Sequence, residues 1–127
     1  MLDRQSIEEA TLPGSEGQIQ ILAGHAGMIG SLELGEFSFK STQGERTYGV
    51  VSSGYFEVLE GQVNVMAETI ELKGEIDAAR ARQAQTNAEN TLRGAELDEQ
   101  MFKKYQLKLQ RSLIRQQVAG KEHGQST

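Results

Sequence analysis

The sequence predicts an α+β fold, in which an N-terminal antiparallel β-sandwich is followed by a C-terminal antiparallel α-helical hairpin. Three observations support this class. Apolar residues recur with period two up to about residue 70, ten of the fourteen glycines lie between residues 14 and 61, and residues 75–90 are rich in alanine and lack glycine and proline. Strand side chains alternate between two faces, whereas helices repeat about every 3.6 residues. We therefore expect a sandwich domain over residues 1–72 and a hairpin domain over residues 73–127.

The strands are predicted from short alternating segments that turn residues separate. QIQI at 18–21, EFSFK at 36–40 and QVNVMA at 62–67 each alternate apolar with polar side chains, as half-buried strands do. Gly44 and Gly61 each stand between two such segments, which is typical of hairpins. Many short strands with frequent turns favour a sandwich or a barrel over a parallel sheet.

Two helices are predicted, over about residues 75–90 and 96–118, with Gly94 between them. The first carries a narrow stripe of small side chains, and the second carries a wider apolar face. The stripe consists of Ala81, Ala84, Ala88 and Leu92, and the face consists of Met101, Phe102, Tyr105, Leu109 and Leu113. A short connection makes the pair an antiparallel hairpin. The polar tail from residue 120 onward is expected to be disordered.

A basic stripe lies beside the apolar face of the second helix. It consists of Lys104, Lys108, Arg111 and Arg115, which fall within about 60° of one another at 100° per residue. No acidic residue occurs between positions 100 and 121, so no acidic partner at i, i+4 relieves the repulsion. A solvated basic surface is the alternative interpretation. The pattern favours an acidic partner surface.

Composition and charge exclude several classes of function. The 127 residues include no cysteine, which excludes disulfides, thiolate zinc sites and thiol catalysis. No apolar run approaches the roughly 20 residues of a membrane span, so we expect no direct membrane insertion, and the N-terminus does not resemble a signal peptide.

Residues 1–75 hold twelve acidic residues against four basic ones, whereas residues 76–127 hold six acidic residues against nine basic ones. The net charge of −5 argues against nucleic acid. No catalytic set, phosphate loop or metal cluster is evident.

Three segments in this order resemble the epsilon subunit of bacterial F-type ATP synthases, over residues 11–118. They are TLPGSEGQIQILAGHAGMIGSL at 11–32, VVSSGYFEVLEGQVNVMAETIE at 50–71 and IDAARARQAQTNAE at 76–89. The resemblance implies a non-catalytic rotor subunit, located in the central stalk of a proton- or sodium-translocating synthase, which couples the gamma subunit to the membrane rotor ring. It also implies that the C-terminal helices extend toward the catalytic beta subunits and inhibit ATP hydrolysis. The implied location is the cytoplasmic face of the bacterial inner membrane, peripheral through the complex.

The resemblance also implies which residues of the sandwich meet the rotor ring. His25 matches the contact loop, with Glu16 and Gln18 on the preceding turn and strand. A histidine that only stabilises its own glycine-rich loop is the alternative. Family members usually open with a strand before the segment matching residues 6–14. Only about ten residues precede Thr11, so the sandwich is expected to lack this strand and to expose an unpaired edge.

A regulatory ATP site is a further implication of the resemblance. Some members bind ATP through a motif that Ile76, Asp77, Arg80 and Ala81 match, with Glu71 on the adenine side. Arg111 and Arg115 have the expected four-residue spacing for phosphate contacts, although one position late, and Asn87 replaces another arginine. The alternative is that Asp77 stabilises the helix start and Arg80 is a solvated surface residue. No cofactor is required, and ATP is expected only as a regulatory ligand.

A different class of function stays open from the residues themselves. A small sandwich with a helical hairpin also suits a free-standing adaptor, which captures an acidic protein, or a nucleotide-sensing module that acts outside a motor.

Overall fold

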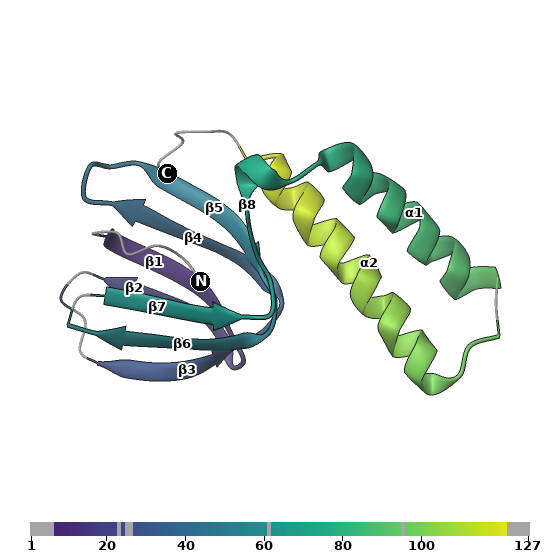
Figure 1. Cartoon of the computed structure of the whole chain (residues 1–127), viewed down its shortest axis with the longest axis horizontal. Coiled ribbons are helices and arrows are strands. Elements are labelled where there is room, and N and C mark those ends of the chain that lie inside the picture. The colour runs from purple at the N-terminus through teal and green to yellow at the C-terminus, as the bar shows by residue number, and fades with distance from the viewer. Residues whose placement is uncertain (1–6, 23, 25–26, 61, 95, 122–127) are drawn as a thin grey trace.

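The computed structural model describes residues 7–22, 24, 27–60, 62–94 and 96–121, and its strands precede its helices as predicted (Figure 1). The elements in chain order are β1 (Ile7–Gly14), β2 (Gly17–Leu22), β3 (Met28–Leu32), β4 (Gly35–Ser41), β5 (Arg46–Val51), β6 (Gly54–Leu59), β7 (Gln62–Ala67), β8 (Ile70–Leu72), the 3₁₀ turn η1 (Lys73–Glu75), α1 (Ala78–Gly94) and α2 (Glu99–Ala119). The predicted fold class, a sandwich followed by a helical hairpin, is confirmed.

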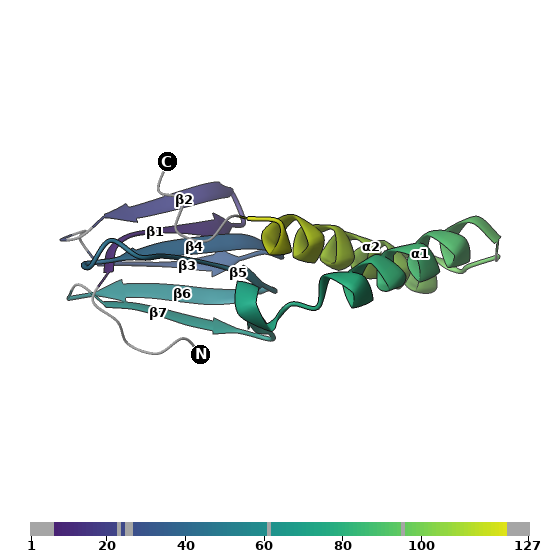
Figure 2. The ribbon, with the colours of Figure 1, turned by 90° about the horizontal axis from the view of Figure 1, so that it is seen from above.

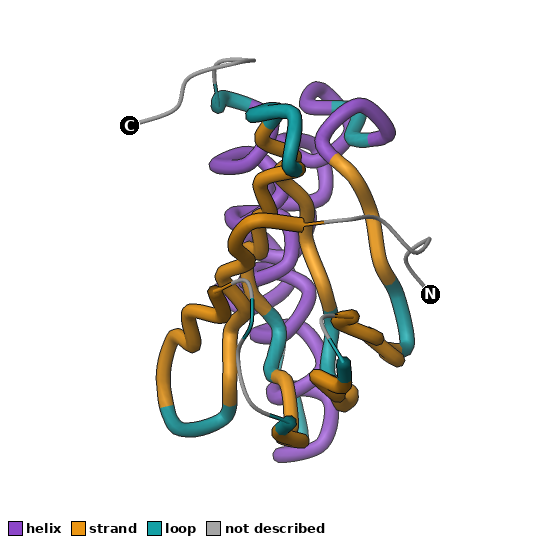
Figure 3. The backbone as a smooth tube through the Cα atoms, turned by 90° about the vertical axis from the view of Figure 1, so that its left-hand side faces the viewer, coloured by secondary structure: helices purple, strands orange, loops and turns teal. Residues whose placement is uncertain are grey.

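The strands form one continuous antiparallel sheet that folds around its own core. Its order is β7-β6-β3-β1-β4-β5-β8, and β2 pairs with β1 outside this path. Figure 2 shows the two sides of the sandwich, with β1 and β2 toward one side and β6 and β7 toward the other. In the part of the chain that the structure describes, β2, β7 and β8 each pair along one edge only. Seen from the sandwich end, the helices lie behind the strands (Figure 3).

The core takes its side chains from the positions that the alternation predicts. Ile21, Phe37, Phe39 and Val65 are buried, and the rings of Phe37 and Phe39 stack with centroids 6.4 Å apart. The other buried members are Ala10, Leu12, Leu32, Val51, Phe56 and Val58. Strands β1 to β7 all contribute, so the sandwich has a single core.

Glycine permits a turn at one end of β5 and a close contact within it. Gly44 has φ +87°, a conformation that L residues rarely adopt, and its turn joins the predicted hairpin of β4 and β5. A Cβ at Gly49 would lie 2.5 Å from the Phe37 ring and 2.7 Å from the Glu71 carbonyl oxygen. The absence of a side chain at Gly49 therefore lets β8 approach β5 beside a core phenylalanine.

Both helices begin later than predicted, because an aspartate caps each one. The Arg80 amide donates to Asp77 Oδ1 over 3.1 Å at the start of α1, and the Met101 amide donates to Asp98 Oδ1 over 2.8 Å at the start of α2. Such side-chain acceptors satisfy amides that lack a partner within the helix. Glu75, expected at the start of the first helix, belongs instead to the 3₁₀ turn η1.

The helices pack through small side chains rather than through the wide apolar face of α2. Ala81 and Ala88 are buried on α1, as their stripe predicts, and Ser112 is buried on α2. By contrast, Met101, Phe102 and Leu113 are 37–46% exposed. Small buried side chains on both helices allow the two backbones to pack closely. Gln116 Nε2 also donates to Gln85 Oε1 over 2.7 Å between the helices.

The hairpin meets the sandwich mainly through the last turns of α2, which contact β4, β5 and η1. Val118 near the end of α2 is fully buried and Val50 on β5 is 5% exposed, although neither belongs to the sandwich core. The rest of the hairpin projects away from the strands (Figure 1). The division into domains at residue 73 stays a prediction. Among the described residues, no helix is long and apolar enough to cross a membrane.

Candidate functional site

The junction between the sandwich and the hairpin holds an ion pair formed by two of the predicted ligand-binding residues. Arg115 Nε donates to Glu71 Oε1 over 2.7 Å, and about a third of each side chain is exposed. The fold thus brings the two residues together, as the ATP hypothesis requires. It also pairs their charges with each other, so a phosphate at Arg115 would compete with a carboxylate already in place.

The other residues of the predicted ATP motif lie at the start of α1. Asp77 accepts from the Arg80 amide and its carbonyl accepts from the Ala81 amide, so its side chain serves as a helix cap. Ala81 is buried against α2, Ile76 is half-buried and Arg80 is exposed. These contacts agree with the alternative interpretation, in which Asp77 stabilises the start of the helix. They leave the Arg80 guanidinium on the surface.

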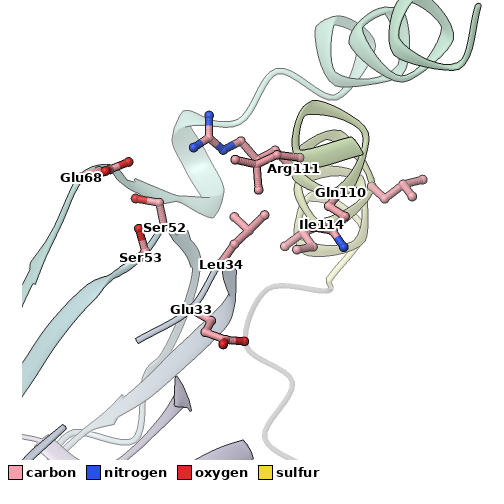
Figure 4. Close-up of a pocket in the computed structure, with 10 residues that line it drawn as sticks. Glu33, Leu34, Ser52, Ser53, Glu68, Gln110, Arg111 and Ile114 are labelled. Atoms are coloured by element: carbon pink, nitrogen blue, oxygen red, sulfur yellow. The ribbon is translucent and has the colours of Figure 1, made fainter. Parts of the chain in front are cut away.

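Arg111 lines a cavity of about 630 Å³ between α2 and the end of the sandwich. Leu34, Leu107 and Ile114 form part of its apolar wall, and two glutamates, Glu33 and Glu68, lie on the sandwich side. The guanidinium extends toward the side of the cavity where Glu68 lies (Figure 4). Arg111 Nε is buried and has no hydrogen-bond acceptor among the described residues. This cavity does not include the motif at the start of α1.

Lys104 and Lys108, the other half of the basic stripe, lie further along α2 from the sandwich. Both are exposed, and their ammonium groups lie 6.0 and 5.1 Å from the centroid of the Tyr105 ring. The four bases therefore form one stripe along the helix but have two environments. Arg111 and Arg115 face the junction, whereas the two lysines face solvent beside an aromatic ring.

Two of the three residues predicted to contact a rotor ring lie in the part of the chain that the structure describes. Gln18 lies near the start of β2, and Glu16 lies in the turn before it; both are exposed. Leu22 ends β2, and a six-residue strand is roughly 20 Å long, so Glu16 and Leu22 lie near opposite ends of this strand. His25 itself lies outside the described residues. The grouping of these three residues into one contact region therefore stays a prediction.

A polar cluster around Lys121 is absent from the sequence-based prediction. The ammonium of Lys121, two residues beyond α2, lies 3.4 Å from Glu36 Oε1 and 5.4 Å from the centroid of the Tyr48 ring. Sequence analysis assigned residue 121 to a disordered tail, and this assignment is wrong for Gly120 and Lys121. No spacing or motif in the sequence relates Lys121 to β4 and β5. Residues 122–127 lie outside the described residues.

An exposed apolar face on β3, β6 and β7 was also missed. It consists of Ile29, Tyr55, Leu59 and Met66, which are 53–73% exposed. Tyr55 lies directly opposite both Ser31 and Met66 in the strand register, and Ile29 is two residues from Ser31, so these side chains share the outer surface. Glu57 lies on the same surface between Tyr55 and Leu59, opposite Ile29 and Asn64 in the register. Exposed apolar side chains that gather on one surface of a soluble protein often mark a site that binds a partner.

Metal chemistry has no candidate in the part of the chain that the structure describes. No group of three histidine, cysteine, aspartate or glutamate side chains there lies close enough to hold an ion. At the junction, Glu71 and Arg115 pair with each other, whereas Arg111 Nε is buried and has no acceptor among the described residues.

Comparison with known proteins gives matches over nearly the whole chain. A family model described as the beta-sandwich domain of the ATP synthase Delta/Epsilon chain matches residues 2–73, and one described as the long alpha-helix domain matches residues 75–120. The ATP synthase epsilon chain of Geobacter metallireducens is 39% identical over 92% of this chain and 84% of its own length. That of Trichlorobacter lovleyi is 39% identical over 91% of this chain and 83% of its own.

Two solved structures are similar in fold. A chain from the mitochondrial ATP synthase of Euglena gracilis, solved with OSCP, F1 and the c-ring, has a TM-score of 0.76 and 22% identity, covering 89% of this chain and 70% of that one. A chain from the central stalk and c-ring of the Tetrahymena thermophila mitochondrial ATP synthase has a TM-score of 0.53 and 14% identity, covering 90% and 83%. At these identities the likeness concerns the fold alone.

Proposed function

Because this chain belongs to the ATP synthase delta/epsilon family, we propose that its sandwich joins the gamma subunit to the membrane rotor ring and that its hairpin regulates ATP hydrolysis. Membership makes it a non-catalytic subunit of the central stalk in a rotary ATP synthase. The chain then works on the cytoplasmic face of the bacterial inner membrane, where its complex holds it at the membrane.

The observation that carries the docking proposal is the apolar face of Ile29, Tyr55, Leu59 and Met66. These four large side chains project from three neighbouring strands and are more than half exposed. Burial of such side chains is worth roughly 25 cal/mol per Å², so a partner that covers them gains binding energy without disturbing the core. We assign this face to the gamma subunit.

Co-purification tests this assignment and the function together. Tyr55→Glu replaces an aromatic side chain of this face by a second carboxylate beside Glu57, and we expect it to abolish recovery of the chain with gamma, whereas Thr42→Glu in the exposed β4–β5 turn changes nothing. Retention equal to that of the unmodified chain would contradict docking through this face. An unmodified chain that never co-purifies with ATP synthase subunits would instead support the free-standing adaptor or nucleotide sensor.

Contact with the rotor ring is proposed for the segment that carries His25, which follows β2 in the sequence. Glu16 and Gln18 lie in the turn before β2 and near its start, so this proposal is confined to His25. His25→Asp should then reduce retention on membranes and lower proton coupling, while Glu16→Gln should not. Unchanged retention and unchanged coupling in the His25 variant would remove this segment from the contact.

Inhibition of hydrolysis is proposed for the basic stripe of α2. In an opened hairpin, all four bases would project toward an acidic segment of the catalytic beta subunits, with Leu107 and Ile114 as apolar contacts. Two observations support this. The hairpin packs largely through alanines and serine, and Leu107 and Ile114 line the cavity at the junction, so that opening frees both. An acidic surface of the beta subunits therefore has only the modest contacts of the docked hairpin to replace.

ATP as a regulatory ligand follows from the same two-state hairpin. Glu71 and Asp77 lie before α1 while Arg115 lies on α2, so a ligand that contacts both elements favours the docked state by mass action. The Glu71–Arg115 contact supports this proposal, because it brings two of the predicted ligands to one place. The side chains of Arg80 and Arg111 would have to move toward the Glu71–Arg115 contact to reach the same ligand.

A further inference from the structure

The end of α2 is fixed to the sandwich at a site that the basic stripe does not include. The Lys121 amide donates to the Val118 carbonyl over 3.0 Å, and the Gly120 amide donates to the Gln116 carbonyl over 3.1 Å, so the chain stays wrapped against the helix end. Val118 itself is fully buried. This geometry presents the Lys121 side chain to the outer surface of β4 and β5.

The surroundings of Lys121 there are a carboxylate and an aromatic ring. Glu36 Oε1 is buried and accepts no hydrogen bond from the described residues, and the Lys121 ammonium lies 3.4 Å from it. Tyr48 offers its ring face at 5.4 Å, within the range of a cation–π contact. The nearby Arg46 is held by Glu9 and Ser38. The Nε of Arg46 is buried and has no acceptor among the described residues. Among those residues, Lys121 is the cation within 4 Å of the buried Glu36 Oε1, which would be costly to leave uncompensated.

We propose that Lys121, Glu36 and Tyr48 form a clasp that holds the end of α2 on β4 and β5 and sets the fraction of chains with a docked hairpin. The clasp needs no ligand, since its three members belong to this chain. It also lies outside the stripe of Lys104, Lys108, Arg111 and Arg115, so its strength is adjustable without changing the charges proposed to meet the beta subunits. Its regulatory consequence rests on the proposed function, but its existence is testable on the isolated chain.

The test uses the absence of cysteine from the sequence. Val118→Cys places a single thiol at the buried contact, and Val50→Cys places one on the opposing strand; both positions are shielded while the hairpin is docked. The rate of thiol labelling then reports how often the hairpin leaves the sandwich. Val58→Cys, in the sandwich core, reports global unfolding. Each thiol is combined with Lys121→Gln, with Glu36→Gln, or with Lys103→Gln.

Lys103→Gln is the matched control, because Lys103 pairs with Glu99 within α2 at 3.3 Å and makes the same charge change away from the junction. We expect Lys121→Gln to raise labelling at residues 50 and 118 by about two- to fivefold, the range for a partly exposed ion pair. Labelling at residue 58 stays unchanged, and Lys103→Gln changes none of the three rates. The double variant Glu36→Lys with Lys121→Glu restores protection at both sites.

Three outcomes would overturn the clasp: equal rates in the Lys121→Gln and Lys103→Gln chains, a rise at residue 118 alone, which indicates fraying of the helix end, or an equal rise at residue 58. The proposed inhibition is judged separately in the assembled enzyme. Faster labelling at residues 50 and 118 together with unchanged ATP hydrolysis would support the clasp and contradict the inhibitory role of the hairpin.

Discussion

Glu71 and Arg115 are 44 positions apart in the sequence, yet they form an ion pair of 2.7 Å that joins the last strand of the sandwich to the second helix. The pair uses one member of the basic stripe while the hairpin is docked. Arg115 therefore has two competing partners: Glu71 in the docked state and, in the proposed function, an acidic surface in the extended state. Glu71 belongs to only one of these states, which makes it the more informative position to change.

Glu71→Gln should increase inhibition in the assembled enzyme. The change removes the docked partner of Arg115 but keeps all four bases, so the population shifts toward the extended hairpin. An ion pair of this exposure is worth about 0 to 1 kcal/mol, and ATP hydrolysis should fall by at most about fivefold. Arg115→Gln breaks the same pair and also weakens the extended contact, so it should not lower hydrolysis. Glu45→Gln, in an exposed turn, is the control. Higher hydrolysis in the Glu71 variant would contradict the competition.

ATP should bind weakly and should perturb the start of α1. A phosphate that approaches Arg115 must displace the Glu71 carboxylate, so we expect NMR shifts of residues 71–81 only at high micromolar to millimolar ATP. Arg80→Ala should reduce these shifts, whereas Arg93→Ala, at the far end of α1, should not. The absence of shifts at millimolar ATP, or equal shifts in the Arg80 variant, would remove the nucleotide site.

Gly49→Ala should destabilise the sandwich by about 1 to 3 kcal/mol, because the new methyl group would overlap the Phe37 ring and the Glu71 carbonyl oxygen. Gly74→Ala is the matched control, since no atom outside its own chain neighbours lies within 4 Å of its Cβ position. Its free energy of unfolding should stay the same or rise by up to about 1 kcal/mol. Urea unfolding with an unchanged m-value measures both. Equal free energies of unfolding in the two variants would show that β8 can move away from β5 at no cost and make room for the methyl group.

The fold could be predicted from the sequence because its evidence is local. Alternation over 36–40 and 62–67 identifies strands whose inward residues, Phe37, Phe39 and Val65, are buried, and the change to a helical period after residue 74 separates the two parts. The predicted helix starts were less accurate, since in each helix an aspartate two residues after the expected start proved to be the cap.

The sites could not be predicted to the same extent, because they depend on register and docking. Met66 is a polar-side position of an alternating strand, and only the pairing of β7 with β6 brings it beside Tyr55. Likewise, Lys121 meets Glu36 because Val118 is buried against the sandwich, which no spacing in the sequence encodes. The basic stripe was identified from its spacing, but its division into two environments follows from how α2 docks.

Loss of the basic stripe should relieve inhibition, and the division of the stripe allows its two roles to be separated. A chain truncated after Gly94, and a variant with alanine at Lys104, Lys108, Arg111 and Arg115, should both raise ATP hydrolysis by the assembled enzyme. Alanine at Lys104 and Lys108 alone should raise ATP hydrolysis less while leaving the docked contacts intact, because these lysines face solvent in the docked state.

Each exposed ion pair with the beta subunits contributes only about 0 to 1 kcal/mol, so a single substitution should do little. Inhibition by the unmodified chain should weaken as salt screens the pairs. If hydrolysis is the same with the truncated, fourfold and unmodified chains, the hairpin has no inhibitory role and serves only as packing.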